Sequence, residues 1–251
     1  MTESSSSLQP SNSGPLEITV LGGFRFWIKG KDALPGLPGG SQRLLALLAI
    51  REESLTRTEA AESLWPEASY AHAHGNLRSA LSRLSAVEHE AVVASDHELR
   101  LAAQVTVDIR EARALARRLL NLSQERERAG DLSDRAIAAL SQELLPDWYD
   151  DWALIEAEDW RQLRMRALHT IIERLIASGH YADATGAALA VVKAEPLRET
   201  SHIALIRVHL AEGNRAEALA AFDRYRTLIR AELGVEPGPR IQALIKDLQS
   251  R

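Results

Sequence analysis

A nine-residue pattern occurs twice in the C-terminal half of the chain, at an offset of 34 residues. Ile176–Ala184 and Leu210–Ala218 align with a glycine at the fourth position and alanines at the seventh and ninth. A glycine at a turn, followed by small residues on the next helix, predicts stacked helix pairs when it recurs at this period. The repeat constrains the fold strongly, because such pairs bury their apolar faces against one another.

The 34-residue period is typical of tetratricopeptide repeats. A more diverged copy begins at Ala129-Gly130-Asp131 and continues with alanines at 136, 138 and 139. Chance recurrence in an alanine-rich chain is the alternative interpretation. We therefore expect residues 106–251 to form an all-α, tetratricopeptide-like domain with a concave binding surface.

Residues 16–105 predict a different, smaller domain. Leu16–Ile28 alternates apolar and polar residues around Gly22-Gly23, which predicts a β-hairpin. Two short strands, at 91–94 and 98–102, predict a second hairpin. We predict three helices between these hairpins, so the expected fold is mainly α, with an N-terminal winged helix-turn-helix that carries a small β-sheet and a wing hairpin.

The three helices are marked by caps and apolar runs. Ser41 is the expected N-cap of a buried helix that reaches Glu52. Thr56 and Glu59 form a capping box for a second helix, which stops at Pro66. The third helix covers residues 72–84.

The third helix has two distinct faces. An apolar stripe consists of Ala73, Leu77, Ala80, Leu81 and Leu84. Its other side carries small residues, hydroxyls and arginines, and no acid occurs between Glu67 and Glu88. This composition suits the DNA major groove, although a surface helix that happens to lack acids is the plain alternative. The predicted DNA-binding residues are Arg43, His74, Asn76, Arg78, Ser79, Ser82, Arg83 and Arg100.

Composition excludes several classes of protein. The chain has no cysteine, so disulfides and thiol catalysis are excluded, and we find no catalytic or nucleotide-binding motif. We expect no enzyme activity, no cofactor and no metal. The Ser-rich residues 1–15 predict a disordered tail rather than a secretion signal, and no apolar run could cross a membrane. We therefore expect a cytoplasmic, nucleoid-associated protein.

Beyond the second hairpin the pattern is helical, with one interruption. We predict helices at 109–122, capped by Asp108, and at 131–144. Asp147–Trp152 combines acidic and aromatic residues. We interpret this segment as a solvated connector, because it lacks the ligand spacing of a calcium loop.

Several motifs resemble the Streptomyces antibiotic regulatory protein type of transcriptional activator. These proteins join an OmpR-like winged helix to a bacterial transcriptional activator domain, and the resemblance covers residues 16–248. It rests on Leu16–Gly22, Gln42–Leu48, Asn76-Leu77, Leu81–Leu84, Pro196–Glu199 and Glu232–Pro239, the last being the most specific.

The resemblance implies a sequence-specific activator that binds direct repeats of double-stranded promoter DNA near a −35 element. It further implies recruitment of RNA polymerase holoenzyme through its sigma factor, a homodimer on DNA, and pathway-specific control of secondary metabolism. The alternative is a repeat scaffold whose winged helix serves as a protein interface.

Two departures from the family pattern weaken the expected grip on phosphate. Ser85 stands where the family commonly has a basic residue, and the wing is Glu98-Leu99-Arg100-Leu101 instead of Gly-Tyr-Arg-Leu. Residues 1–105 carry 9 basic and 12 acidic side chains, a net charge of −3. Because nonspecific affinity for DNA comes mainly from cations that displace counterions, we expect weak binding by a single copy.

Overall fold

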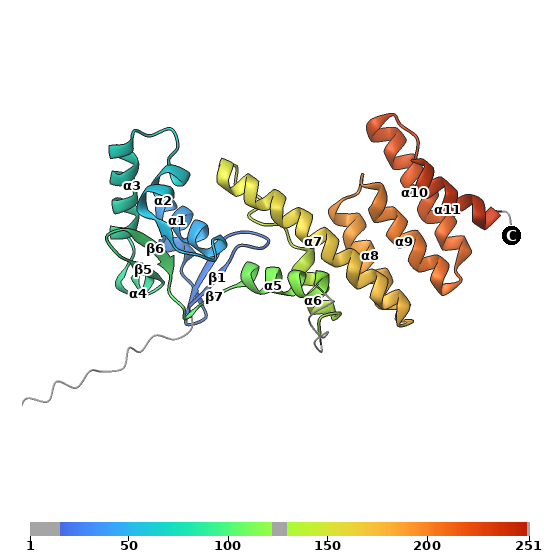
Figure 1. The fold of residues 1–251 in the computed structure, drawn as a ribbon, viewed down its shortest axis with the longest axis horizontal. Coiled ribbons are helices and arrows are strands. Elements are labelled where there is room, and N and C mark those ends of the chain that lie inside the picture. Colours follow the sequence, from blue (N-terminus) through green and yellow to red (C-terminus); the bar gives the residue numbers. More distant parts are fainter. Residues whose placement is uncertain (1–15, 122–129, 250–251) are drawn as a thin grey trace, which may run out of the picture. The chain divides into compact units, whose positions relative to one another are not determined.

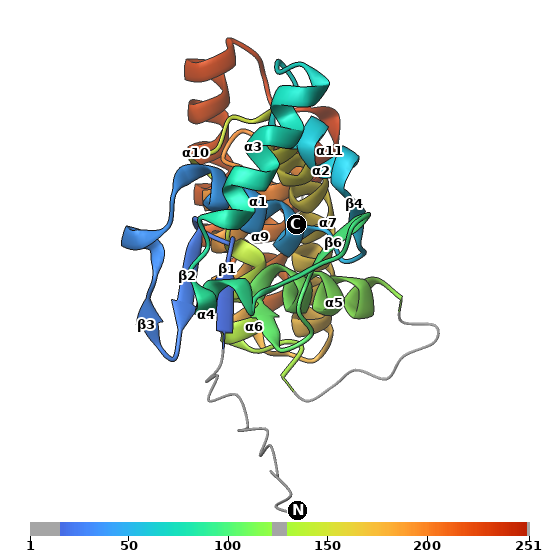
Figure 2. The ribbon, with the colours of Figure 1, turned by 90° about the vertical axis from the view of Figure 1, so that its left-hand side faces the viewer.

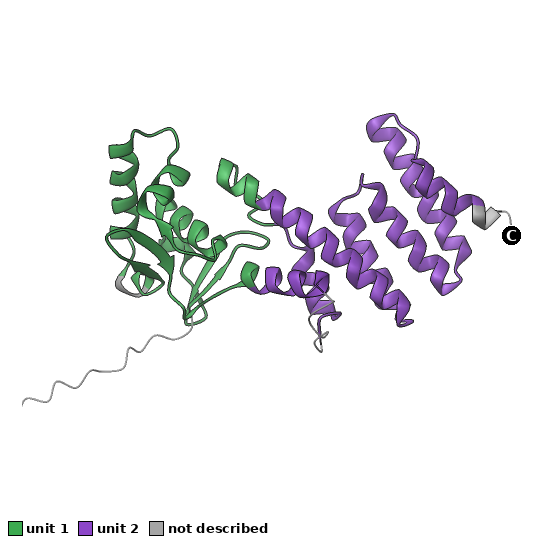
Figure 3. Cartoon of the chain, viewed as in Figure 1, with its two compact units in different colours: residues 1–110, 144–156 green, residues 111–143, 157–251 purple. Residues whose placement is uncertain are grey.

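A computed structural model describes residues 16–121 and 130–249. The predicted tail, at 1–15, and Ala129 of the third repeat copy lie outside these described residues. The chain forms two compact units (Figures 1 and 3). Unit 1 runs to residue 110 and includes 144–156, whereas unit 2 contains 111–143 and the chain from 157. The sequence-based division at 105/106 stays a prediction.

Unit 1 contains a four-stranded sheet in the order β3-β2-β1-β7. Strand β1 (Leu16–Thr19) pairs antiparallel with β2 (Arg25–Ile28), and β2 pairs with β3 (Lys31–Asp32). The predicted hairpin is confirmed, with positive φ angles at Gly22 and Gly23 in its turn. Strand β7 (Val105–Val107) pairs parallel with β1, a pairing that the sequence pattern did not predict.

Three helices lie beside this sheet: α1 (Gly39–Ile50), α2 (Arg57–Leu64) and α3 (Tyr70–Ser82). The capping box of α2 is confirmed, since Thr56 and Glu59 exchange both hydrogen bonds. The prediction of Ser41 as an N-cap is wrong. Pro38 occupies that position, while the buried Ser41 hydroxyl donates to the Ala80 carbonyl at 2.7 Å.

The predicted wing is present and has an additional strand. Strand β5 (Val92–Ala94) pairs with β6 (Glu98–Leu101), and β6 also pairs with β4 (Leu55–Thr56). Two short helical segments, η1 (Leu34–Gly36) and α4 (Ala86–His89), complete the elements before residue 105. The winged helix with a preceding sheet therefore matches the expected architecture.

The segment 144–156 belongs to unit 1 and is only partly solvated, contrary to the sequence interpretation. Leu144 bridges to Leu21, and the Leu145 amide donates to the Val20 carbonyl at 2.9 Å. Leu144 and Leu145 are buried, because the apolar side chains of this segment pack against unit 1. The Trp148 ring lies 5.8 Å from that of Phe24.

In the residues that the structure describes, all regular elements of unit 2 are helices. Its helices are α5 (Asp108–Leu120), α6 (Asp134–Ser141), α7 (Asp151–Ala177), α8 (Tyr181–Ala194), α9 (Glu199–Glu212), α10 (Arg215–Leu233) and α11 (Pro239–Gln249), of which α5 and α7 begin in unit 1. The helix expected from Asp131 begins at Asp134 and ends at Ser141. Ser133 caps it, whereas the buried Asp131 forms an ion pair with Arg118 at 3.0 Å.

The repeated turns confirm the 34-residue pattern. Gly179 and Gly213 both have left-handed backbones, with φ of 77° and 87°. After each glycine, the next amide reaches back five residues, from His180 to Leu175 and from Asn214 to His209. The equivalent bonds show that both copies end their first helix in the same way, which only glycine does without strain.

Candidate nucleic-acid interface

Helix α3 is held in unit 1 by one apolar face. Ala73, Leu77, Ala80 and Leu81 are buried, and the helix packs against α1 and α2. Leu84, the last residue of the predicted stripe, is also buried but follows the end of the helix. Because this face is anchored, the orientation of the opposite face is fixed within unit 1.

The opposite face of α3 is accessible to solvent. Figure 2 views unit 1 with this helix labelled. The exposed side chains include five predicted DNA-binding residues: Asn76, Arg78, Ser79, Ser82 and Arg83. Arg83 is the C-cap residue, so its side chain leaves the final turn. The structure therefore gathers these five residues on one element.

The N-terminal turn of α3 adds an aromatic pair. The His74 ring lies 4.2 Å from the Tyr70 ring, and its Nε2 lies 3.5 Å from the Thr58 hydroxyl. Tyr70 is 65% exposed, although it is a large aromatic residue. Sequence reasoning missed Tyr70. The sequence feature that could have identified Tyr70 is its position directly after Ser69, at the start of a helix whose first turn faces solvent.

Gly75 leaves the middle of this face without a side chain. A methyl group at this position would lie 3.8 Å from Nη2 of Arg78, and the Arg78 side chain therefore extends back over Gly75. Long helical side chains generally point toward the N-terminus in this way. The guanidinium group therefore lies closer to the N-terminal turns of α3. In helix-turn-helix proteins, residues in the N-terminal part of the recognition helix contact the base edges.

One arginine lies on the wing and a second holds the wing from α2. Arg100 is exposed on β6. Arg57, which sequence reasoning did not select, donates from Nε to the Ser95 carbonyl at 2.8 Å, and its amide donates to the His97 carbonyl at 2.9 Å. Arg57 therefore fastens the turn of the wing hairpin to the start of α2.

Arg43 lies in a different environment from the α3 residues. Its guanidinium group forms an ion pair with Asp150, and the two side chains are 31% and 26% exposed. A contact between Arg43 and DNA phosphate stays a prediction. It would require Arg43 to share its guanidinium group with Asp150 or to leave this partner.

The residues that the structure describes contain no cluster of three or more metal-ligating side chains. Within the same ranges, no helix is long and apolar enough to cross a membrane. The arrangement on α3 and the wing instead offers hydrogen-bond donors and cations around a protruding helix, which is suited to recognition of a polyanion.

The family model described as "Bacterial transcriptional activator domain" matches residues 107–249, which include all the helices from α5 to α11. The chain belongs to this family. The match confirms the predicted resemblance to the Streptomyces antibiotic regulatory protein type of activator. Members of the bacterial transcriptional activator domain family are transcriptional regulators and not enzymes.

Two curated relatives resemble nearly the whole chain. "Regulatory protein AfsR" of Streptomyces coelicolor is 30% identical over 94% of this chain, and that of Streptomyces griseus is 27% identical over the same share. The chain spans 24% of the length of each relative. The similarity therefore concerns one part of these larger regulators.

A solved structure has the same fold. Mycobacterium tuberculosis EmbR, in complex with a low-affinity phosphopeptide, matches 94% of this chain with a TM-score of 0.62 and 21% identity. The match covers 65% of the EmbR chain. It supports the order of a winged helix followed by a helical domain.

Proposed function

We propose that this regulator is a sequence-specific activator that binds double-stranded promoter DNA through α3. The observation that carries the proposal is the outward face of this helix, where Asn76, Arg78, Ser79, Ser82 and Arg83 are exposed opposite an anchored apolar stripe. The protein would act on DNA in the cytoplasm, at the nucleoid.

The positions of the residues on α3 suggest which of them contact bases and which contact phosphate. Arg78 is suited to a base contact, because it lies at mid-helix and a guanidinium group can donate two hydrogen bonds to guanine. Arg83 at the end of α3 and Arg100 on the wing are suited to phosphate contacts. His74 and Asn76 lie in the first turns, which commonly contact base edges.

The shortage of cations suggests that one copy binds DNA weakly. Arg78, Arg83 and Arg100 are exposed, whereas Arg43 is paired with Asp150. With about three to four cations within range of phosphate, the logarithm of affinity should fall with the logarithm of salt at a slope of about −3 to −4. We propose that a homodimer on direct repeats, together with RNA polymerase holoenzyme, raises the effective concentration enough for useful binding.

The resemblance supports the remaining parts of the proposal. They are direct repeats near a −35 element, contact with the sigma factor, and pathway-specific control of secondary metabolism. The helical repeats of unit 2 would supply the surface for protein partners, as stacked helix pairs commonly do.

Footprinting upstream of the chain's own gene and of neighbouring genes tests the proposal. Protected direct repeats beside a −35 element are the expected result. Binding should then be measured on one half-site, on two half-sites, and on two half-sites with holoenzyme, each over a salt series. Nanomolar binding to one half-site at physiological salt, unimproved by a second site or by polymerase, would contradict the charge argument.

A specific observation favours a second candidate function, in which the winged helix binds protein. The wing exposes Asp96 and Glu98 beside Val93, which is 42% exposed, and such a surface would repel phosphate. A gel-shift assay at stated salt separates the two candidates. The protein interface would be favoured if no upstream fragment is shifted and if the protein binds a protein partner through the exposed surface of the wing.

A further inference from the structure

Two sequence motifs that the proposed function leaves unexplained meet in unit 2. Glu199, from the Pro196–Glu199 motif, accepts a hydrogen bond from the amide of Gly238, in the Glu232–Pro239 motif. A Cβ at position 238 would lie 2.8 Å and 2.9 Å from the two carboxylate oxygens. An alanine here would therefore force the flexible end of the Glu199 side chain to shift, which would disturb the contact that ties the start of α9 to the segment before α11.

A pocket of about 280 Å³ lies beside this contact, and we name it the arginine pocket. Its lining residues come from α7, α9, α11 and the loop before α9: His169, Arg198, Thr200, Ile203, Ala204, Arg207 and Arg240. Arg198 directly precedes Glu199, and Arg240 lies two residues after Gly238. The two motifs thus hold two guanidinium groups at one cavity.

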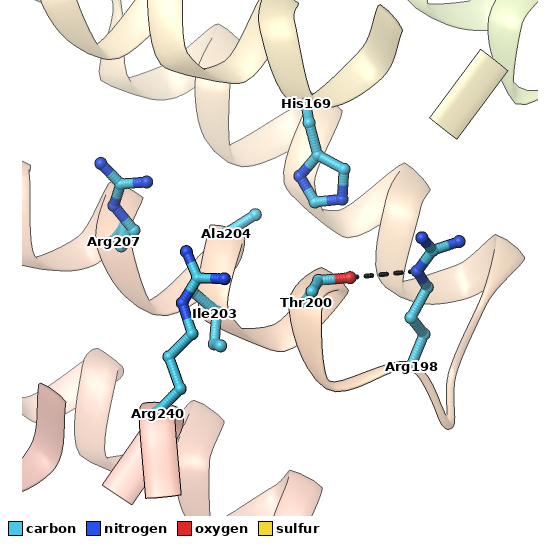
Figure 4. Close-up of a pocket in the computed structure, with 7 residues that line it drawn as sticks. All are labelled: His169, Arg198, Thr200, Ile203, Ala204, Arg207 and Arg240. Carbon is cyan, nitrogen blue, oxygen red and sulfur yellow. Dashed lines mark hydrogen bonds between the residues drawn. The ribbon is translucent and has the colours of Figure 1, made fainter. Parts of the chain in front are cut away.

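The arginine pocket has an excess of positive charge. Its lining includes three arginines and no acid. Arg207 forms an ion pair with Glu173, but Arg240 makes no ion pair or hydrogen bond with any residue that the structure describes. Arg198 donates from Nε to the Thr200 hydroxyl at 3.1 Å, which directs its planar group along the pocket wall (Figure 4).

His169 supplies an unsatisfied polar atom at the same place. Its Nε2 is buried and has no hydrogen-bond partner among the described residues. Figure 4 shows the ring directed toward Thr200 and Arg198. Burial, and secondarily the charge of Arg198, lower the pKa of His169. A buried polar atom without a partner is costly, so a ligand that accepts a hydrogen bond here would be stabilised.

We propose that the arginine pocket binds the phosphate group of a small phosphorylated molecule. Donors approach from three helices and a loop, so they surround a bound group rather than lying in one plane. A tetrahedral phosphate offers oxygens in several directions, whereas the two oxygens of a carboxylate share a plane with their carbon. The guanidinium group of an arginine can donate two parallel hydrogen bonds to one phosphate group.

The size of the pocket favours a small molecule as the carrier of this phosphate. Small-molecule sites commonly enclose about 300–1,000 Å³, and the arginine pocket lies just below this range. Ile203 and Ala204 provide an apolar wall against which the carbon skeleton of the ligand can lie. This site goes beyond the proposed contact with DNA, which involves unit 1.

Calorimetry of the full chain in phosphate-free buffer tests the proposal. The probes are inorganic phosphate, glycerol phosphate, malonate and a phosphoserine peptide. We expect saturable binding of one glycerol phosphate per chain, weaker binding of inorganic phosphate, and little binding of malonate. No saturable phosphate binding, equal binding of malonate, or tightest binding of the peptide would overturn the proposal.

Substitutions locate the binding. Arg240→Gln should weaken glycerol phosphate by about tenfold or more, because it removes a charged hydrogen-bonding group. Gly238→Ala should also weaken it, since Glu199 must move. Arg166→Gln is the matched control, because Arg166 is exposed on α7, near His169 in sequence but outside the pocket lining. Wild-type affinity in the Arg240→Gln protein, with an unchanged circular dichroism spectrum, would contradict the site.

Discussion

Ser41 illustrates how one hydroxyl helps to fix the position of α3 within unit 1. It is fully buried on α1 and donates to the carbonyl of Ala80 at 2.7 Å. Ala80 lies near the C-terminal end of α3, where carbonyl groups lose their partners within the helix. The bond therefore satisfies a group at a helix end and ties α1 to α3.

Replacement of Ser41 by alanine should destabilise unit 1 by about 1–3 kcal/mol, the usual cost of leaving a buried carbonyl without a partner. Urea unfolding of the full chain, followed by circular dichroism, measures this effect. Ser54→Ala is the control because Ser54 is exposed, and it should change the free energy of unfolding by less than about 0.5 kcal/mol. Equal stabilities of the two variants would show that the Ser41 bond contributes little.

A substitution at Gly75 should change helix stability and DNA binding in opposite directions. Gly75→Ala should stabilise α3 by about 0.5–1 kcal/mol, because glycine is a poor helix former and the new methyl would make only an ordinary contact with Arg78. If α3 enters the major groove, the same methyl should weaken DNA binding by crowding the approach. Thermal unfolding and gel-shift titration of one preparation measure both effects. A stabilised protein with unchanged DNA affinity would argue against close approach at Gly75.

At the scale of elements, local signals in the sequence predicted the structure best. The Thr56–Glu59 capping box and the glycines at 179 and 213 determine their turns through neighbouring residues, and all were predicted. The α3 face followed from helical periodicity alone. These features need no knowledge of distant parts of the chain.

Long-range partners were not predictable from the sequence. Asp108 has the pattern of a helix cap, but its carboxylate also accepts hydrogen bonds from the amides of Val20 and Leu21. Burial raises the pKa of Asp108, and these amide bonds oppose the shift. The arginine pocket likewise depends on two motifs that meet only in the folded chain, and the Arg43–Asp150 pair joins residues far apart in sequence.

A buried histidine of α9, packed against α10, is expected to make the stability of unit 2 depend on pH. His202 is buried, its Nε2 donates to the Pro196 carbonyl at 2.8 Å, and its ring lies 4.3 Å from that of Tyr225. Burial lowers the pKa of His202, which favours the neutral ring in the folded state. Below the ordinary pKa of about 6.5, the unfolded chain therefore binds a proton that the folded chain resists.

The free energy of unfolding of unit 2 should consequently fall as the pH drops from about 7.5 to about 5.5. His202→Gln should reduce this loss, since a glutamine amide can still donate to Pro196 but does not titrate. His97→Gln, on the exposed wing, is the control. Denaturant unfolding at both pH values measures the difference, and an identical pH dependence in His202→Gln would exclude this histidine as a cause.

At the scale of the whole molecule, unit 1 depends on a segment that is distant in sequence. Residues 144–156 supply the buried side chains of Leu144, Leu145 and Trp152. Asp150 in this segment pairs with Arg43, and Glu156 pairs with Arg51 at 3.1 Å. Unit 1, which contains α3, is thus completed by chain that lies beyond α6.

A fragment that ends at residue 110 should therefore be less stable than one in which a flexible linker joins it to residues 144–156. Loss of large buried apolar side chains costs about 2–5 kcal/mol each, so the difference should be several kcal/mol. Chemical unfolding of both fragments gives the comparison. Equal stability would show that 144–156 contributes nothing to the folding of unit 1.

The exposed face of α3 is proposed to recognise a base sequence, and the ratio of affinities for specific and scrambled DNA in arginine variants tests this recognition. Affinities for the footprinted duplex and for a scrambled duplex are measured at one salt concentration for the wild-type protein, Arg78→Ala, Arg83→Ala and Arg25→Ala. Arg25 is the control, because it lies on β2 and pairs with Asp32 at 3.8 Å.

We predict that Arg78→Ala loses about 1–3 kcal/mol on the footprinted duplex and little on the scrambled one, so the ratio falls. Arg83→Ala should weaken binding to both duplexes alike, and Arg25→Ala should leave both affinities unchanged. Equal losses on the two duplexes for Arg78→Ala would contradict recognition of bases by this residue.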